Sequence, residues 1–365
     1  MKLGQVDYRA LLTKLKDERD NMRDYLTNTK NLAFHTDENG TSRMTIETTN
    51  NTVAQYGITE LAERQLAERL KIPTKYYDYM KANQPELLDN NVNTWLQEKP
   101  EKRFVRTLHG NVRAFLSDRY QRIDNLEIAL KALQVLNENK DFTTGSLEVT
   151  ENHLYIKVIS ERFTDEIAKG DAVQAGFVVS NSEVGLGCVK IEPLIYRLVC
   201  TNGMILPDRM HKKYHVGQRQ SFEDDYAIEM FRAETIETSN KAYLMKVEDI
   251  LRGALNERIF RDTVAKMRKA NEVTIDVDPV ETVKALGENM LLTEAERIKI
   301  SANYMNDENF TQYGLANAVT KTANTTADYE RATELERMGG YVLDMDIETM
   351  LKNVDGRSKK NKKLF

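Results

Sequence analysis

The sequence predicts an α+β fold with a central, mostly antiparallel β-rich core, inserted helices, and helical regions on both sides. Strand-like runs of Val, Ile, Leu and Tyr gather between residues 101 and 235, whereas helical spacing of apolar residues dominates before and after them. These helical and strand-like stretches come in blocks, which is the order of α+β proteins rather than of parallel βαβ proteins. The low content of 6 Pro and 17 Gly favours long regular elements.

A chain of 365 residues exceeds the usual size of one compact core, so we expect several regions. Their boundaries follow the changes between helical and strand-like spacing. The expected regions are a mainly helical N-terminal region (1–100), a β-rich core (101–235), a helical C-terminal region (236–355) and a basic tail (356–365).

The N-terminal region is predicted to contain a helix over 6–30 and extended chain over 31–53. Thr59 is the expected N-cap of a further helix, and Pro73 opens the next one. This pair is either a plain helical hairpin or a helix-turn-helix that reads DNA. In the second case its second helix would present Lys75, Tyr76, Tyr79 and Lys81.

The β-rich core is expected to begin with a hairpin, whose strands at about 103–108 and 112–116 flank the turn His109-Gly110-Asn111. Asp124 is the expected N-cap of the helix that follows. Later strands are predicted in two segments, 145–160 (around Glu151-Asn152) and 174–206.

The stretch YRLVCTNGMIL, residues 196–206, is predicted to form a core strand from Tyr196 to Thr201 that turns at Asn202-Gly203. Alternation along that strand places Cys200 on the same face as Leu194, so we expect Cys200 to be buried.

The C-terminal region is predicted to be helical from about residue 236, with a long apolar stripe between Tyr243 and Met267. Thr293 and Glu296 have the spacing of a capping box. A last helix over 328–338 is expected to end at Gly339-Gly340.

The motif tests for enzymes are negative. The patterns GxxxxGK[ST], HExxH, GxSxG and CxxC are absent, and Gly185-Leu186-Gly187 lacks the third glycine of a dinucleotide site. We therefore expect no cofactor and no catalytic residue, and a non-enzymatic protein is favoured over an enzyme.

Two cysteines and two histidines, Cys188, Cys200, His211 and His215, form the candidate metal set. The histidine spacing fits a zinc finger, but zinc knuckles place their cysteines two to four residues apart. Cys200 also lacks a neighbouring base that would activate it as a nucleophile. The sequence therefore favours structural roles, and no metal ligand is predicted.

Basic residues mixed with aromatic residues form the remaining candidate site. Such mixtures suit the grooves that bind single-stranded nucleic acids, while the alternative is that the arginines pair with carboxylates. The predicted nucleic-acid-binding residues are Lys102, Arg103, Arg106, Arg113, Arg119, Tyr120, Arg122, Arg197, Arg209, Lys212 and Lys213.

Charge and hydropathy limit the partners. The net charge is −5, and the basic tail carries five positive residues and no acid. No apolar run reaches about 18 residues, so no membrane partner is expected. The start of the chain lacks an apolar signal segment, and two cysteines form no disulfide framework, so a cytoplasmic location is expected.

Several phrases together resemble an uncharacterised family of phage- and plasmid-borne proteins catalogued as a domain of unknown function. They are RAFLSDRYQRIDNLEIALKAL, GDAVQAGFVVSNSEVGLGCVKIEPLIYRLVCTNGMI, TQYGLANAVTKTANTTADYERATELERMGG and ITELAERQLAERLKIPTKYY. The resemblance covers roughly residues 55–340. It implies a mobile element in a bacterial cytoplasm, and it assigns no reaction and no site residue.

The sequence leaves two hypotheses for the function. The first is a non-enzymatic nucleic-acid-binding protein of a phage or mobile element that handles single strands in recombination or replication. The alternative is a protein that binds a host protein, as an anti-defence factor or a scaffold, or that associates with itself. The acidic body and the amphipathic C-terminal helices favour this alternative.

Overall fold

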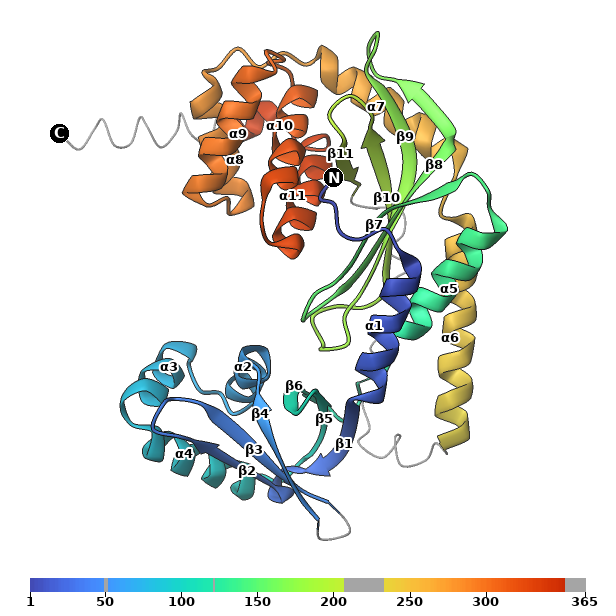
Figure 1. Ribbon diagram of the computed structural model, residues 1–365. Helices are drawn as coiled ribbons and strands as arrows, with labels where there is room; N and C mark the ends of the chain where they lie inside the picture. Colours follow the sequence, from blue (N-terminus) through green and yellow to red (C-terminus); the bar gives the residue numbers. More distant parts are fainter. Residues whose placement is uncertain (49–51, 121, 207–232, 352–365) are drawn as a thin grey trace, which may run out of the picture.

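The structure is a computed structural model that describes residues 1–48, 52–120, 122–206 and 233–351. It contains two β-sheets in different parts of the molecule, with helices packed on both (Figure 1). The sheets are almost entirely antiparallel and the helices are largely segregated from the strands in sequence. The predicted α+β fold class is therefore confirmed.

The first sheet combines strands that are far apart in sequence. In sheet order they are β1 (Met22–Asn28), β5 (Lys102–Leu108), β6 (Asn111–Ser117), β4 (Val53–Ile58), β3 (Ser42–Glu47) and β2 (Leu32–Thr36). Neighbours are antiparallel except β4 and β6, which pair in parallel at Gly57 and Asn111. The hairpin β5–β6 forms around the predicted turn, and it joins the strands of the N-terminal region in one sheet.

Three helices cover one face of the first sheet: α2 (Glu60–Arg69), α3 (Thr74–Asn83) and α4 (Pro85–Glu98). Because side chains alternate along a strand, Phe34 and Ile46 both point to this face, where they pack with Leu66 and Leu88. Thr59 caps α2 as predicted, since its hydroxyl accepts a hydrogen bond from the backbone N–H of Ala62.

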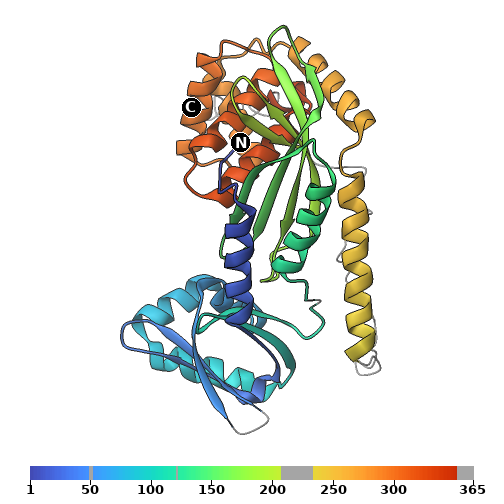
Figure 2. The same ribbon diagram turned by 45° about the vertical axis from the view of Figure 1, so that its right-hand side comes forward.

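The second sheet is a run of antiparallel neighbours in the order β11 (Asn202–Ile205), β10 (Lys190–Arg197), β9 (Ala172–Asn181), β8 (Leu154–Glu166) and β7 (Phe142–Val149). One face is covered by α1 (Tyr8–Asp20), α5 (Asn125–Glu138) and α6 (Ala233–Gly253). Leu154, Ile156 and Val158 of β8 supply that face. Helix α6 runs alongside α5 in both views (Figures 1 and 2), and Lys131 and Glu248 form an ion pair of 2.6 Å between them.

The C-terminal helices are α7 (Glu257–Glu272), α8 (Pro279–Met290), α9 (Glu294–Asn306), α10 (Gln312–Thr325) and α11 (Tyr329–Val342). Lys157, which points to the opposite face of β8 from Ile156 and Val158, meets α11 there. Its Nζ lies 2.6 Å from Oε2 of Glu336, and both side chains are fully buried. The predicted capping box of Thr293 and Glu296 opens α9.

Two predicted helix boundaries are wrong. The helix expected over 6–30 ends at Asp20, because residues 22–28 extend as β1 and pair with β5 from Met22↔Leu108 to Asn28↔Lys102. Pairing with a strand distant in sequence overrides local helical spacing. The last helix continues through Gly339-Gly340 to Val342. A Cβ at Gly339 would lie 2.2 Å from Cγ2 of Thr320 in α10. That glycine allows α10 and α11 to pack closely.

The prediction for residues 196–206 is also wrong in detail. Strand β10 ends at Arg197, and residues 198–201 form the turn that leads into β11. The register Tyr196↔Gly203 places Asn202-Gly203 inside the ladder rather than in the turn. Cys200 is half-buried in that turn, and its Sγ lies 3.6 Å from Nη1 of Arg197. The segment is thus a β-hairpin whose cysteine lies outside the core.

Candidate functional site

Arg106 is fully buried where the first sheet meets the connection between β9 and β10. Its Nε donates to Oδ1 of Asp24 at 3.0 Å, and its Nη2 donates to Oδ1 of Asp124 at 2.8 Å. Its Nη1 donates to the backbone carbonyl of Glu183 at 3.2 Å. The guanidinium therefore joins β5 to β1, to the start of α5 and to the connection that follows β9.

Arg113 lies beside it and is also buried. Its Nη1 is 3.1 Å from Oε2 of Glu183, and its Nη2 donates to the backbone carbonyl of Glu151 at 3.2 Å. The other oxygen of Glu183 accepts a hydrogen bond of 2.5 Å from the backbone N–H of Asn125. Glu183 thus caps α5 from a distant part of the chain.

Asp124 occupies the predicted N-cap position of α5, but its side chain makes no capping hydrogen bond. Its Oδ2 instead accepts a hydrogen bond of 2.9 Å from Nε of Arg122, and its Oδ1 accepts the one from Arg106. Arg122 also lies 3.3 Å from Asp24 and is half-exposed. The cap is thus supplied by Glu183 while Asp124 holds two guanidinium groups.

These six side chains are called the joint cluster: Arg106, Arg113, Arg122, Asp24, Asp124 and Glu183. Three guanidinium groups face three carboxyl groups, so the cluster is close to neutral. Bringing a phosphate to Arg106 or Arg113 would first require the loss of a carboxylate partner. The loss of one member of a buried ion pair lowers the stability of a protein by about 3–5 kcal/mol. The arrangement is therefore suited to holding the two sheets together.

Two carboxyl groups of the joint cluster have opposite pKa shifts. Burial raises the pKa of Glu183, against the charges of Arg113 and Arg106. Burial also acts to raise the pKa of Asp124, but the hydrogen bond from Arg122 and the charge of Arg106 outweigh it and lower that pKa. The difference follows from the two guanidinium groups that Asp124 binds directly.

The other predicted binding residues lie in several places. Arg103 is buried and pairs with Glu101, while Arg197 pairs with Asp171. The hydroxyl of Tyr120 donates to the backbone carbonyl of Ser182 at 2.9 Å, and its ring stacks on Phe104. Lys102 and Arg119 are exposed. Arg209, Lys212 and Lys213 lie outside the described residues, as does the basic tail.

Sequence reasoning missed Asp24 and Glu183 as partners of the arginines. Asp24 fell in a segment expected to be helical, and Glu183 fell in the segment 174–206, where strands were expected. Asp24 and Glu183 lie 82 and 77 positions from Arg106 in sequence, and no local sequence pattern connects either of them to Arg106.

The candidate metal set is not assembled by the described residues. Cys188 and Cys200 form no disulfide, and His211 and His215 fall outside the described ranges. Within the described ranges, no group of three or more His, Cys, Asp or Glu side chains is arranged to hold a metal ion.

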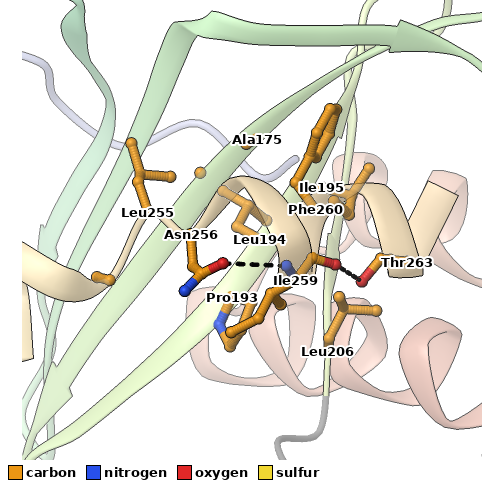
Figure 3. Close-up of a pocket in the computed structure, with 12 residues that line it drawn as sticks. Ala175, Pro193, Leu194, Ile195, Leu206, Leu255, Asn256, Ile259, Phe260 and Thr263 are labelled. Carbon is orange, nitrogen blue, oxygen red and sulfur yellow. Dashed lines mark hydrogen bonds between the residues drawn. The ribbon is translucent and has the colours of Figure 1, made fainter.

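A shallow hollow lies between β9, β10 and the corner that joins α6 to α7 (Figure 3). It holds about 260 Å³ of empty space, part of it open to solvent, and its lining is mainly apolar. The side chain of Asn256 accepts hydrogen bonds from Arg258 and Ile259, and Thr263 donates to the carbonyl of Ile259. These two polar side chains of the hollow are therefore engaged in hydrogen bonds to the backbone of α7.

The helical pair α2 and α3 carries a second group of predicted residues. Tyr76 and Tyr79 are 43 % and 62 % exposed, whereas Tyr77 and Met80 of the same helix are buried in the core. Lys81 lies 2.7 Å from the buried Glu63. The predicted helical pair is therefore confirmed, with two tyrosines on its outer face.

In the part of the chain that the structure describes, no helix combines the length and the apolar character needed to cross a membrane.

The fold and the joint cluster define an α+β protein in which a set of buried ion pairs joins two sheets. The family model described as a domain of unknown function, DUF932, matches residues 113–364, and the chain belongs to this family. The matched part begins at Arg113 in β6 and includes Asp124 and Glu183 of the joint cluster. Comparisons with curated proteins and with solved structures found no match.

Proposed function

We propose that the protein is a non-enzymatic nucleic-acid-binding protein whose phosphate contacts lie outside the joint cluster. The observation that carries the proposal is the separation of charge along the chain. The whole chain has net charge −5 and the basic tail has +5, so the other 355 residues have −10. A cluster of five positive residues on an acidic chain is a distinct site of attraction for a polyanion.

A second basic stretch supports the same proposal. Arg209, Lys212 and Lys213 lie close together in sequence, with Arg219 following and Asp208 as the acid beside them. The resemblance to phage- and plasmid-borne proteins gives the context of the proposal, which is the handling of single strands during recombination or replication of a mobile element in a bacterial cytoplasm.

Fluorescence anisotropy with a labelled single-stranded oligonucleotide tests the proposal. The affinity of the full chain should fall with salt, because phosphate contacts release counterions. Replacing the five basic tail residues by Gln should reduce the slope of log K against log salt by up to about 3.5, at about 0.7 for each contact to a single strand. The absence of binding at about 50 mM salt would overturn the proposal.

A matched control separates the tail from general charge. Five exposed lysines on the folded body are replaced by Gln in the control variant, which changes the net charge equally: Lys140, Lys169, Lys241, Lys246 and Lys299. The salt slope of this variant should stay close to that of the unmodified chain. A slope reduced as much as in the tail variant would contradict a specific role of the tail.

The second candidate function is the binding of a host protein or self-association. Apolar side chains exposed on and beside α8 and α9 favour it, since Leu291 is 86 % exposed and Ile298 is 63 % exposed. Light scattering measures self-association. A nuclease-treated pull-down from bacterial lysate tests the host partner, and loss of the captured protein on Ile298→Glu would support it.

A further inference from the structure

The outer side of α3 and the turn before it form a small surface of rings and cations. We call Lys71, Lys75, Tyr76 and Tyr79 the α3 face. Tyr76 and Tyr79 are one helical turn apart, so their side chains are neighbours on the helix surface. Other residues of α3 pack in the core, since Tyr77 is fully buried and Met80 is 4 % exposed. The packing of α3 therefore leaves the two outer rings available.

The two lysines of the α3 face contribute no ion pair to the described part of the fold. Among the described residues, no ion pair involves Lys71 or Lys75. Two acids of the helical pair are already engaged with other cations: Asp78 pairs with Arg64 at 2.6 Å, and Glu63 pairs with Lys81. This differs from the joint cluster, where every guanidinium has a carboxylate.

Lys71 occupies a backbone conformation that favours glycine. Its φ is +60°, and it follows the end of α2, where the N–H of Ile72 donates to the carbonyl of Ala67 at 2.8 Å. Glycine is the usual residue at this position of a helix end, and a left-handed conformation costs other residues about 1–2 kcal/mol. Here a lysine occupies it and its side chain is exposed.

We infer that the α3 face binds single-stranded nucleic acid, with the rings of Tyr76 and Tyr79 stacking on bases and with Lys71 and Lys75 contacting phosphates. This inference rests on the proposed function and adds a binding surface on the folded body. Exposed rings stack on the unpaired bases of a single strand, whereas the bases of a duplex are already stacked.

The rings supply most of the expected affinity. Glu68, in the last turn of α2, and Glu86, in the first turn of α4, are exposed acids that flank the face in sequence. Their charges oppose the phosphates and reduce the contribution of the two lysines. Stacking on each ring is expected to change the affinity about five- to 150-fold.

The experiment measures the binding of labelled oligothymidine of about 20 nucleotides to the full chain and its variants. Tyr76→Ala and Tyr79→Ala should each weaken binding about five- to 150-fold, and Tyr79→Phe, which keeps the ring, should restore it. Tyr341→Ala on α11 is the matched control, because Tyr341 is 49 % exposed. Its affinity should equal that of the unmodified chain.

The lysines are tested without loss of folding. Lys71→Gly removes the charge and relieves the backbone conformation, so this variant should be at least as stable as the unmodified chain. The double variant Lys71→Gly/Lys75→Gln should have a salt slope reduced by up to about 1.4.

The outcomes separate this inference from the proposed function. Binding that is unchanged in both tyrosine variants, while the tail variant loses its salt slope, overturns the α3 face and leaves the proposed function in place. Equal or tighter binding of a duplex of the same length also overturns it. The absence of any binding by the full chain overturns both.

Discussion

The basic residues of the joint cluster and those of the α3 face have opposite surroundings. Both regions combine basic side chains with aromatic neighbours, but Arg106 and Arg113 are buried and paired, whereas Tyr76 and Tyr79 are exposed. The difference is due to carboxylates from segments distant in sequence: Asp24 lies in β1, and Glu183 lies in the connection between β9 and β10. A basic and aromatic composition therefore does not distinguish a binding surface from a structural ion-pair network.

The largest effect is expected in the joint cluster. Arg106→Met removes the buried cation of Asp24 and Asp124, leaves them only the half-exposed Arg122, and should lower the free energy of unfolding by about 3–5 kcal/mol. Arg122→Gln should cost about 1 kcal/mol or less, because Arg122 is 48 % exposed. Urea denaturation measures both values. Equal losses in the two variants would contradict the structural role of burial in this cluster.

Tyr77 and Tyr79 of α3 allow a comparison of a buried ring with an exposed ring on the same helix. Tyr77→Ala removes a fully buried ring and should lower the free energy of unfolding by about 3–5 kcal/mol. Tyr79→Ala should change it by less than about 0.5 kcal/mol, because that ring is largely exposed. Thermal denaturation of the two variants checks this contrast. A large loss in Tyr79→Ala would show that its ring packs against the fold.

Glu296, at the start of α9, is expected to contribute stability that is lost at low pH. The hydrogen bond from Arg331 lowers the pKa of Glu296 from 4.5 to about 2, with support from the backbone N–H of Thr293. The folded protein therefore binds this proton less tightly than the unfolded chain. The stabilisation is complete above about pH 4.5 and is lost as the pH falls towards 2.

The variant Glu296→Gln should show a shallower loss of stability between pH 4.5 and 2 than the unmodified chain. Urea denaturation at several pH values measures the two slopes. Identical slopes would show that Glu296 has an ordinary pKa in the folded protein.

A neutral or stabilising effect is expected at Lys71. Lys71→Gly should leave the free energy of unfolding unchanged or raise it by up to about 1 kcal/mol, because glycine adopts positive φ without steric cost. Leu291→Gly is a comparable variant, since Leu291 has φ +52° and is largely exposed. A clear loss of stability in both variants would contradict these backbone conformations.

Local patterns were sufficient for much of the fold. Thr59 and the pair Thr293–Glu296 cap helices as predicted, and His109-Gly110 forms the turn of the β5–β6 hairpin. These features depend on residues that are close in sequence. Strand β1 depends instead on pairing with β5, so its helical spacing was misleading.

The candidate site was harder to predict because burial is a property of the tertiary structure. The sequence located Arg106 and Arg113, and it left open whether they bind phosphate or pair with acids. Their partners come from segments that no spacing rule connects to them. The Tyr76 and Tyr79 positions were visible as part of a helical pair, but their exposure followed only from the packing of Tyr77 and Met80.

Photo-crosslinking tests the central claim most directly. The full chain is irradiated with a single-stranded oligonucleotide that carries 4-thiothymidine, digested with trypsin, and mapped by mass spectrometry. Crosslinks are predicted on the peptide YYDYMK, residues 76–81, and not on the peptides between residues 104 and 119 that surround Arg106 and Arg113. Crosslinks on those peptides, with YYDYMK unmodified, would contradict the account.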